Sequence, residues 1–398
     1  MLSIGIIKKI YESASIFRWN DLPRPFDFTE LDKQAHKMII TYVLAKVEED
    51  EKGVKIDWIK LIEGAIFEFL HRIILTDIKP PVFHKMMAEK GEKLNSWVLA
   101  QLNSDIKDLP DDFANKFEKY LYDPNYSRFE KRVLGAAHYL ATSWEFNLIY
   151  NSAPFLYGIE KTKEDIENKI EDYYELAGVQ KIALKKKTYG FIDICGQLRF
   201  QRRWAQSPRV PETSVLGHMF IVAVLSYFMS KELGACDKRT YNNFFAGLFH
   251  DLPEVLTRDI VSPIKRSVKG LEEIIKEYEN LQMEERIMPL LSDEIQKEMN
   301  YLIRDEFENK VIRKGKFEKV DSITKEFNKE EFVPVDGKMI RVCDHLAAFM
   351  EAILSINHGI SSYHLEDGKE HLYKNYKDMV FEGIDIGILY RELYKMNR

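Results

Sequence analysis

The spacing of apolar residues predicts helices along almost the whole chain. Between residues 33 and 51, Met38, Ile39, Tyr42 and Val43 recur at the three-to-four-residue spacing that places side chains on one helical face. The same spacing continues over 56–75, 133–149, 161–177, 218–233, 241–249, 269–283 and 340–356. The alternation typical of strands is almost absent, and its best candidate, 185–194, is short. The pattern therefore predicts an all-α protein.

The polar and charged segments between the predicted helices indicate where the chain divides into domains. A length of 398 residues suggests more than one domain. Low-complexity segments and long flexible linkers are absent from the sequence, and the most charged stretch, 304–331, is expected to form solvated helix and loop. The polar region around 178–188 is the best candidate boundary. We therefore expect two domains, 1–177 and 178–398.

Composition narrows the classes of protein that remain. Hydrophobic residues make up 45% and charged residues 31%, as in folded globular proteins. The net charge of −6 argues against a global attraction to nucleic acid or acidic membranes, although a local basic patch stays open. Three Cys at no metal-ligand spacing exclude a disulfide scaffold and a Cys-rich zinc module, and favour a reducing cytoplasm. We expect neither a signal peptide nor a membrane span.

The two halves of the sequence resemble each other. The pattern R-W-x-x-x-P-R occurs at 18–24 and again at 203–209. At a constant separation of 182, His36 aligns with His218, Asp77 with Asp259, Pro81 with Pro263, and GAIFEF (64–69) with AGLFHD (246–251). AAHYLA (136–141) also resembles CDHLAA (343–348). Amphipathic helices resemble one another by chance, but that does not explain R-W-x-x-x-P-R, so we predict an internal duplication.

The halves differ at the residues that carry chemistry. The second half contains His218, His250, Asp251 and Asp344. At the aligned positions the first half has His36, Glu68, Phe69 and Ala137. Only the second half therefore keeps a full set of two imidazoles and two carboxylates.

Two imidazoles and two carboxylates together suit a divalent cation such as Mn, Fe, Co, Ni or Zn. Mg is less expected because it prefers a shell made only of oxygen. Each of these residues lies in strongly apolar sequence, where an unpaired polar group costs several kcal/mol. We predict one metal ion bound by the second half. A lone histidine on an apolar helix is more often a satisfied core residue, and His36 fits that interpretation.

At these residues the chain resembles the HD superfamily of metal-dependent phosphohydrolases, whose order H…HD…D is met by His218, His250-Asp251 and Asp344. It is most similar to the bacterial 5′-deoxynucleotidase-like branch, through the Arg-Trp pair, PETSVLGH (211–218) and HDLPEVLTRDIVSPIK (250–265). The resemblance covers 199–356, with a weaker echo over 16–146. It implies two tandem HD-like helical bundles, the N-terminal one degenerate.

Two departures from that branch concern the substrate. The doublet and Asp344 are farther apart than in the small nucleotidases, so an additional segment near 266–335 is expected to cover the pocket or build an interface. Gly217 stands where the nucleotidases usually have Glu. The substrate therefore stays open.

The resemblance also implies a role for each matching residue. His218, His250, Asp251 and Asp344 would bind the metal. Glu254, which shares a helical face with the doublet, would orient the attacking water or protonate the leaving oxygen, and the alternative is a solvent-facing glutamate.

The remaining implied roles concern the substrate. Arg203 would bind the phosphate and Trp204 would line the sugar pocket, although the first half retains the same pair, which favours a partly structural role. Asp259 would accept a hydrogen bond from the sugar, or would cap the turn before Pro263. Lys265 would neutralise the phosphate, or would be solvated.

We therefore expect a cytoplasmic metal-dependent hydrolase that releases phosphate from a nucleoside 5′-monophosphate or a similar small phosphate ester. The alternatives are a hydrolase of nucleoside triphosphates or phosphodiesters, and a non-catalytic nucleotide sensor. A triphosphate pocket needs several cations, for which candidates are numerous: Arg202, Arg203, Arg209, Arg258, Lys265, Arg266 and Lys269. No membrane or nucleic-acid partner is expected, and the sequence leaves a homodimer open.

Overall fold

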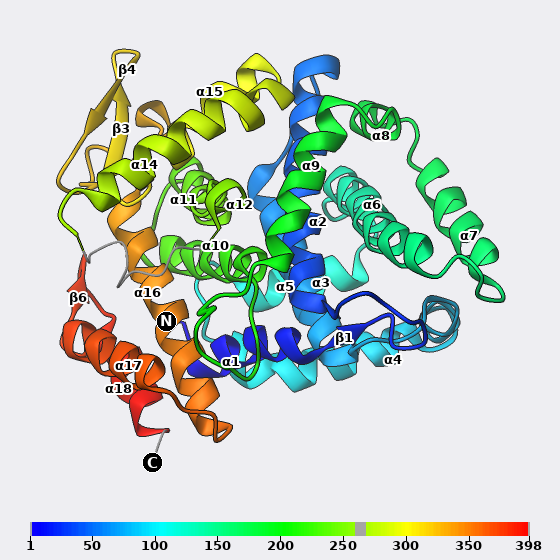
Figure 1. Cartoon of the computed structure of the whole chain (residues 1–398), viewed down its shortest axis with the longest axis horizontal. Coiled ribbons are helices and arrows are strands. Elements are labelled where there is room, and N and C mark those ends of the chain that lie inside the picture. Colours follow the sequence, from blue (N-terminus) through cyan, green and yellow to red (C-terminus); the bar gives the residue numbers. More distant parts are fainter. Residues whose placement is uncertain (1, 259–267, 397–398) are drawn as a thin grey trace. The chain divides into compact units, whose positions relative to one another are not determined.

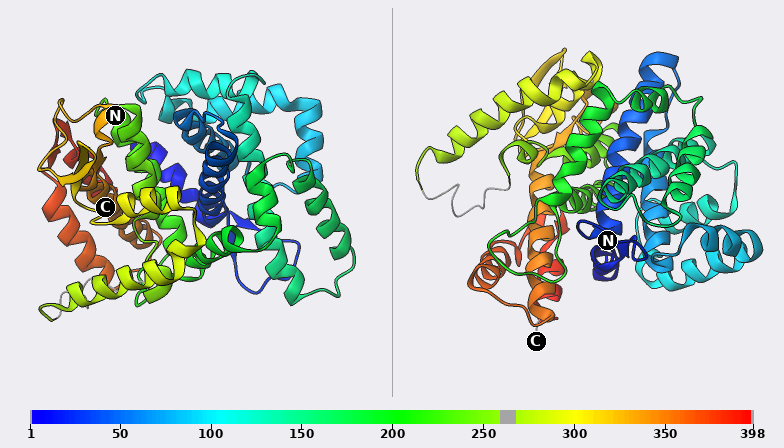
Figure 2. Two further views of the ribbon diagram at one scale, coloured as in Figure 1. Left: turned by 90° about the horizontal axis from the view of Figure 1, so that it is seen from above. Right: turned by 45° about the vertical axis from the view of Figure 1, so that its right-hand side comes forward.

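The computed structural model describes residues 2–258 and 268–396, in which helices dominate two compact units (Figure 1). One unit is Gly5–Gly196, and the other is Gln197–Arg398 together with the first four residues. Strands in the described residues form only short antiparallel pairs and one three-stranded sheet. Figure 2 shows the ribbon of the chain from two further directions. The all-α class predicted from the apolar spacing is confirmed.

The unit Gly5–Gly196 is built around one long central helix, α2. Its elements are α1 (Ile4–Glu12), β1 (Phe17–Arg18), β2 (Phe28–Thr29), α2 (Glu30–Lys52), α3 (Trp58–Leu75), α4 (Pro80–Ile106), α5 (Phe113–Tyr122), α6 (Arg128–Ser152), α7 (Ile159–Glu171), α8 (Ala177–Ala183) and α9 (Lys187–Gln197). Helix α2 contacts α3, α6 and α8, and nearly all of its residues are buried. It is therefore a core helix, and its buried polar and charged residues need partners inside the unit.

The second unit is built around α10. Its helices are α10 (Val215–Glu232), α11 (Asp237–Phe249), α12 (Glu254–Thr257), α14 (Leu271–Gln282), α15 (Asp293–Ile303), α16 (Gly337–Asn357), α17 (Tyr363–Tyr376) and α18 (Gly387–Lys395). Its strands are β3 (Asn309–Arg313), β4 (Lys316–Lys319), β5 (Val335–Asp336), β6 (Val380–Phe381) and β7 (Ile384–Asp385). Helix α10 contacts both α11 and α16.

Within the described residues, α10 is long and apolar enough to cross a membrane by length and composition. In the structure 89% of that window is buried inside the protein. A helix that is apolar on every side is also what the centre of a helical core requires.

Side-chain caps fix where the two main helices of the second unit begin. The Oγ of Ser214 accepts a hydrogen bond from the backbone N–H of Gly217, at 2.9 Å, and starts α10. The carboxylate of Asp336 accepts from the N–H of Met339, at 3.2 Å, and starts α16. Such caps are typically worth about 1 kcal/mol each, and they set the register of both helices.

Two local predictions were wrong. The candidate strand 185–194 lies mostly in α9, where Phe191, Ile192 and Cys195 are buried at helical spacing. The charged stretch 304–331 contains the hairpin β3–β4, and β3 also pairs with β5 (Figure 1). Val311 is fully buried in β3, and Lys310 donates from its buried Nζ to Leu302 O at 3.2 Å. Few buried apolar residues anchor this hairpin, so its apolar signal in the sequence is weak.

The division between the compact units falls at Gly196, later than the boundary expected at 177. Helices α8 and α9 belong to the first unit because their apolar residues are buried there. A Cβ on Gly178 would lie 2.6 Å from the side chain of Leu44, so α8 approaches α2 very closely. The polar sequence around 178–188 is thus a surface of the first unit.

Gly247 brings α11 close to α10, and we expect its replacement by alanine to destabilise the protein. A Cβ there would lie 3.1 Å from Ala223 Cα and 3.2 Å from Ser226 Oγ. Overpacking of this kind costs about 1–3 kcal/mol, which urea denaturation would measure as a lower free energy of unfolding. Gly91→Ala is the matched control, because its nearest neighbour is Met87 Cε at 3.6 Å. A loss equal in both variants would contradict the packing argument.

Candidate metal centre

Three helices of the second unit bring four predicted ligands together. His218 lies in the first turns of α10, His250 and Asp251 follow the last turn of α11, and Asp344 lies on α16. The candidate ligand atoms of His218, His250 and Asp251 all lie within 4.8 Å of one another. His218 Nε2 lies 2.8 Å from Asp344 Oδ1. His218 and Asp344, which are 126 positions apart in the sequence, thus lie in contact.

The two histidines of the cluster are buried and the two aspartates are half-buried, and their charges stabilise one another. Burial disfavours the imidazolium form, yet the Asp251 carboxylate outweighs burial and raises the pKa of His250 to about 9. Against the same effect of burial, Asp344 and Glu351 raise the pKa of His218. His250 in turn lowers the pKa of Asp251, and His218 lowers the pKa of Asp344, although burial acts in the opposite direction on both carboxyls. The carboxylates are therefore ionised and attract a positive charge.

The orientation of His250 fits a metal ligand. Its Nδ1 lies 2.8 Å from the carbonyl oxygen of Gly247, so the ring donates there to the backbone of α11. Its Nε2 then faces the doublet carboxylate, 3.1 Å from Asp251 Oδ2. A backbone hydrogen bond at one ring nitrogen commonly fixes the tautomer of a histidine that binds metal through the other. Two imidazole nitrogens and two carboxylates are a donor set that fits a divalent transition metal.

Arg203 lies beside the two carboxylates. Its Nη1 is 3.7 Å from Asp251 Oδ2 and its Nη2 is 3.9 Å from Asp344 Oδ1. These distances are longer than those of direct hydrogen bonds, and 16% of the side chain is exposed. The guanidinium therefore stands at the edge of the cluster, where an anion that approached the carboxylates and their cation would meet it.

Glu254 is buried rather than solvent-facing. It is the first residue of α12, and only 5% of it is exposed. Its backbone N–H donates to Asp251 O at 3.0 Å, and its carbonyl accepts from Gln201 Nε2 at 3.0 Å. The turn that carries the doublet therefore also fixes the backbone of Glu254. Two further sequence-predicted residues, Asp259 and Lys265, lie outside the described residues.

Trp204 is held by an acid that sequence reasoning missed, Glu351. The indole Nε1 of Trp204 donates to Glu351 Oε2 at 2.9 Å, from a backbone with a φ of 57°. The ring packs against α17, where a Cβ on Gly368 would meet it at 2.7 Å. Glu351 is 1% exposed and lies two helical turns after Asp344. A glutamate within apolar helical sequence on the face of a ligand was the available signal.

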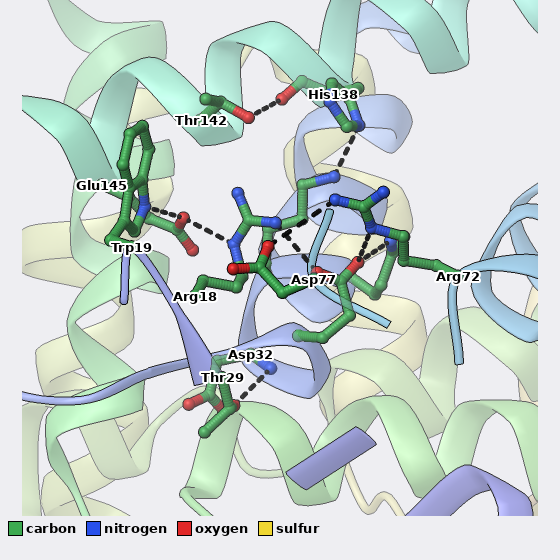
Figure 3. Close-up of polar contacts among 12 residues, drawn as sticks. Arg18, Trp19, Thr29, Asp32, Arg72, Asp77, His138, Thr142 and Glu145 are labelled. Atoms are coloured by element: carbon green, nitrogen blue, oxygen red, sulfur yellow. Dashed lines mark hydrogen bonds and ion pairs between the residues drawn. The ribbon is translucent and has the colours of Figure 1, made fainter. Parts of the chain in front are cut away.

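The first unit has a buried charged cluster of different composition (Figure 3). Arg18 donates from Nε to Glu145 Oε2 at 3.0 Å and from Nη1 to Glu30 Oε2 at 2.9 Å. Trp19 Nε1 also donates to Glu145 Oε2, at 2.9 Å. Lys33 Nζ lies 2.6 Å from His138 Nδ1. Arg18 therefore neutralises both carboxylates, and burial lowers the pKa of Lys33 well below its usual value.

His36 takes no part in that cluster. Its Nε2 lies 2.9 Å from the carbonyl oxygen of Ile192, and its ring packs edge-on against Trp144 with centroids 5.0 Å apart. It is fully buried. These contacts are those expected of a satisfied core histidine.

Comparison with known protein families gives one match, which lies largely in the second unit. Residues 195–373 match the family model of the HD domain. The match contains His218, His250, Asp251 and Asp344, and supports an HD-domain superfamily member. HD domains are in general metal-dependent phosphohydrolases, so the match and the clustered ligands indicate that class of reaction. No curated protein matches the chain.

We expect Asp251→Asn and Asp344→Asn each to weaken metal binding by more than about 100-fold, since replacing an outer-sphere partner alone typically costs 10–100-fold. Elemental analysis after dialysis against Mn²⁺, Co²⁺ or Zn²⁺ would measure the metal retained. Asp193→Asn is the matched control in the first unit, where Asp193 accepts from Trp144 Nε1 at 2.8 Å. Full metal content in both ligand variants would place the metal elsewhere.

Proposed function

We propose that this protein is a metal-dependent phosphohydrolase that releases phosphate from a nucleoside 5′-monophosphate or a similar small phosphate ester. The observation that carries the proposal is the meeting of two histidines and two aspartates with Arg203 at their edge. The four residues would hold one divalent cation, and the arginine would be left to face the substrate.

Each residue near the cluster has a chemical role in this proposal. The cation, when bound by His218, His250, Asp251 and Asp344, supplies a water of lowered pKa and neutralises phosphate charge. Arg203 would bind two phosphate oxygens through its planar fork. Glu254, fixed by the backbone of the doublet turn, would hold or deliver a proton at its carboxylate.

Two of the candidate cations for a triphosphate are already engaged. Arg202 forms an exposed ion pair with Glu212 at 3.0 Å. Arg209 is 4% exposed, hydrogen-bonded to Thr213 Oγ1, and 3.9 Å from Glu351 Oε2. These ion pairs leave fewer cationic side chains to bind a second and a third phosphate group. They therefore favour hydrolysis of a monophosphate over hydrolysis of a triphosphate or phosphodiester.

A phosphate-release screen over nucleoside mono-, di- and triphosphates with Mn²⁺ or Co²⁺ tests the proposal. We expect turnover of monophosphates, measured colorimetrically, and little release from triphosphates. Turnover of triphosphates alone would replace the proposal with its alternative. Metal binding without hydrolysis of any nucleotide or small phosphate ester would favour a nucleotide sensor.

Two variants serve as controls for the screen. Asp251→Ala should abolish turnover, and unchanged turnover would indicate a contaminant or a different site. Glu254→Gln keeps the size of the side chain but removes its acid–base function, so activity should fall by about 10²–10⁴-fold. Elemental analysis should show that Glu254→Gln retains its metal.

We further propose that the first unit is a degenerate copy of the second. Positions 18, 19 and 29 correspond to 203, 204 and 214 at a constant separation of 185. In support, Phe17 pairs with Thr29 as Arg202 pairs with Ser214, and both Thr29 and Ser214 cap the following helix. Trp19 and Trp204 have φ values of 59° and 57°, and each donates to a buried glutamate at 2.9 Å.

This register changes the proposed counterparts of the ligands. A separation of 185 aligns Lys33, rather than His36, with His218. Aligning the two tryptophan-bound glutamates, Glu145 and Glu351, gives His138 rather than Ala137 as the counterpart of Asp344. The contact between Lys33 and His138 then takes the place of the contact between His218 and Asp344. In this proposal a lysine side chain stands where the second unit would bind its cation.

The full chain should therefore bind one equivalent of metal, and Lys33→Met should leave that stoichiometry unchanged. The same variant should lower the free energy of unfolding by about 1–3 kcal/mol, because the buried His138 Nδ1 loses its contact with Lys33 Nζ. Elemental analysis and urea denaturation measure the two effects. Lys60→Met, which breaks an exposed pair with Asp57, is the control and should cost less than about 1 kcal/mol. Two equivalents of metal, or a loss of metal in Lys33→Met, would contradict the proposal.

The remaining parts of the proposal concern the cellular compartment and the partners of the enzyme. Cys195 and Cys343 are buried free thiols, as expected for a protein of the reducing cytoplasm. A small phosphorylated substrate is the proposed partner, and neither a membrane nor a nucleic acid is needed for it.

A further inference from the structure

We propose that Glu351 is a positioning residue of the metal centre, which fixes the ring of His218 and ties it to the loop carrying Arg203. The inference rests on the proposed function only in requiring that His218 binds a metal. It assigns to a buried glutamate a task that neither the H…HD…D order nor the motif of the doublet contains.

The two ring nitrogens of His218 face two carboxylates of the same helix. Nε2 lies 2.8 Å from Asp344 Oδ1, and Nδ1 lies 3.4 Å from Glu351 Oε1. Asp344 and Glu351 are seven residues apart on α16, which places them on one face of the helix. The ring therefore lies along α16, with Asp344 at one edge and Glu351 at the other.

The Glu351 carboxylate is itself held by the 203–213 loop. Thr213 Oγ1 donates to Oε1 at 2.7 Å, and Trp204 Nε1 donates to Oε2 at 2.9 Å. Arg209 Nη1 lies 3.9 Å from Oε2 and balances the charge. Both carboxylate oxygens are thus directed by neighbours, so the group cannot rotate away from His218 without breaking hydrogen bonds in the interior.

This arrangement decides which nitrogen of His218 can bind metal. A carboxylate beside Nδ1 favours the tautomer that carries its proton on Nδ1, and leaves the lone pair on Nε2. Nε2 is the nitrogen that faces Asp344 and the rest of the cluster. Because Trp204 follows Arg203 in the chain, the same carboxylate also sets the position of the guanidinium relative to the metal ligands.

The first unit supplies a natural comparison. Glu145 accepts from Trp19 as Glu351 accepts from Trp204, and it also accepts from Arg18 Nε at 3.0 Å. Glu145 is as deeply buried as Glu351, at 0% and 1% exposure. Glu145→Gln therefore removes a buried, tryptophan-bound carboxylate that orients no candidate ligand, and it is a matched control for Glu351→Gln.

The test is a Co²⁺ titration of the full chain, followed by visible absorption against a competing chelator. Glu351→Gln should weaken Co²⁺ binding by about 10–100-fold and change the absorption of the bound ion, because the ligand field at His218 changes. Glu145→Gln should bind Co²⁺ like the wild type. Far-ultraviolet circular dichroism checks that both variants are folded.

Thr213→Val is a second variant in case Glu351→Gln does not fold. It removes one hydrogen bond to Glu351 Oε1 and leaves the carboxylate in place, so a smaller loss of Co²⁺ affinity in the same direction is expected. The inference is overturned if every folded variant among Glu351→Gln and Thr213→Val binds Co²⁺ with an affinity within twofold of the wild type.

The outcomes separate this inference from the proposed function. A wild-type protein that binds Co²⁺ but hydrolyses no phosphate ester contradicts the proposed function and leaves the Glu351 test readable. A wild-type protein that binds no transition metal overturns both.

Discussion

The burial of carboxylates inside helical cores is the constraint on which both units depend. An ionised carboxylate away from water costs several kcal/mol unless a cation or a set of donors compensates it. In the second unit Asp251, Asp344 and Glu351 face histidines and arginines. In the first unit Glu30 and Glu145 face Arg18 at hydrogen-bonding distance. The groups that compensate the buried carboxylates therefore determine which ligands the centre of each unit could bind.

In the first unit the compensation comes from the chain itself. Arg18 makes two short ion pairs and is 6% exposed, so its guanidinium is committed to the fold. In the second unit Arg203 stays 3.7–3.9 Å from its carboxylates and is partly exposed. Arg18 would have to break two buried ion pairs before it could bind another anion. The difference is compatible with the proposal that Arg203 binds a phosphate.

The Arg-Trp pair connects the outer loop of each unit to its core. In both units the tryptophan adopts a left-handed backbone and donates to a buried glutamate of a long helix. This contact holds the preceding arginine over the centre of the bundle. In the second unit the glutamate that binds the tryptophan, Glu351, also lies beside His218. The loop and the candidate metal centre are therefore connected through its carboxylate. The motif therefore has a structural role in both units, and in the second unit it also lies beside the candidate metal centre.

The sequence by itself determined the helical class, because apolar spacing such as that of 218–233 records which faces are buried. It also predicted that His218, His250, Asp251 and Asp344 form one site, since polar residues inside apolar helices need partners. Tertiary structure alone decided that Nε2 of His218 meets Asp344, and that Glu351 holds the other edge of the ring. It also decided the β3–β4 hairpin and the course of 185–194, where few buried residues leave little periodic signal. The physical reason is that periodicity reports the environment of one helix, whereas a site depends on contacts between residues more than 100 positions apart.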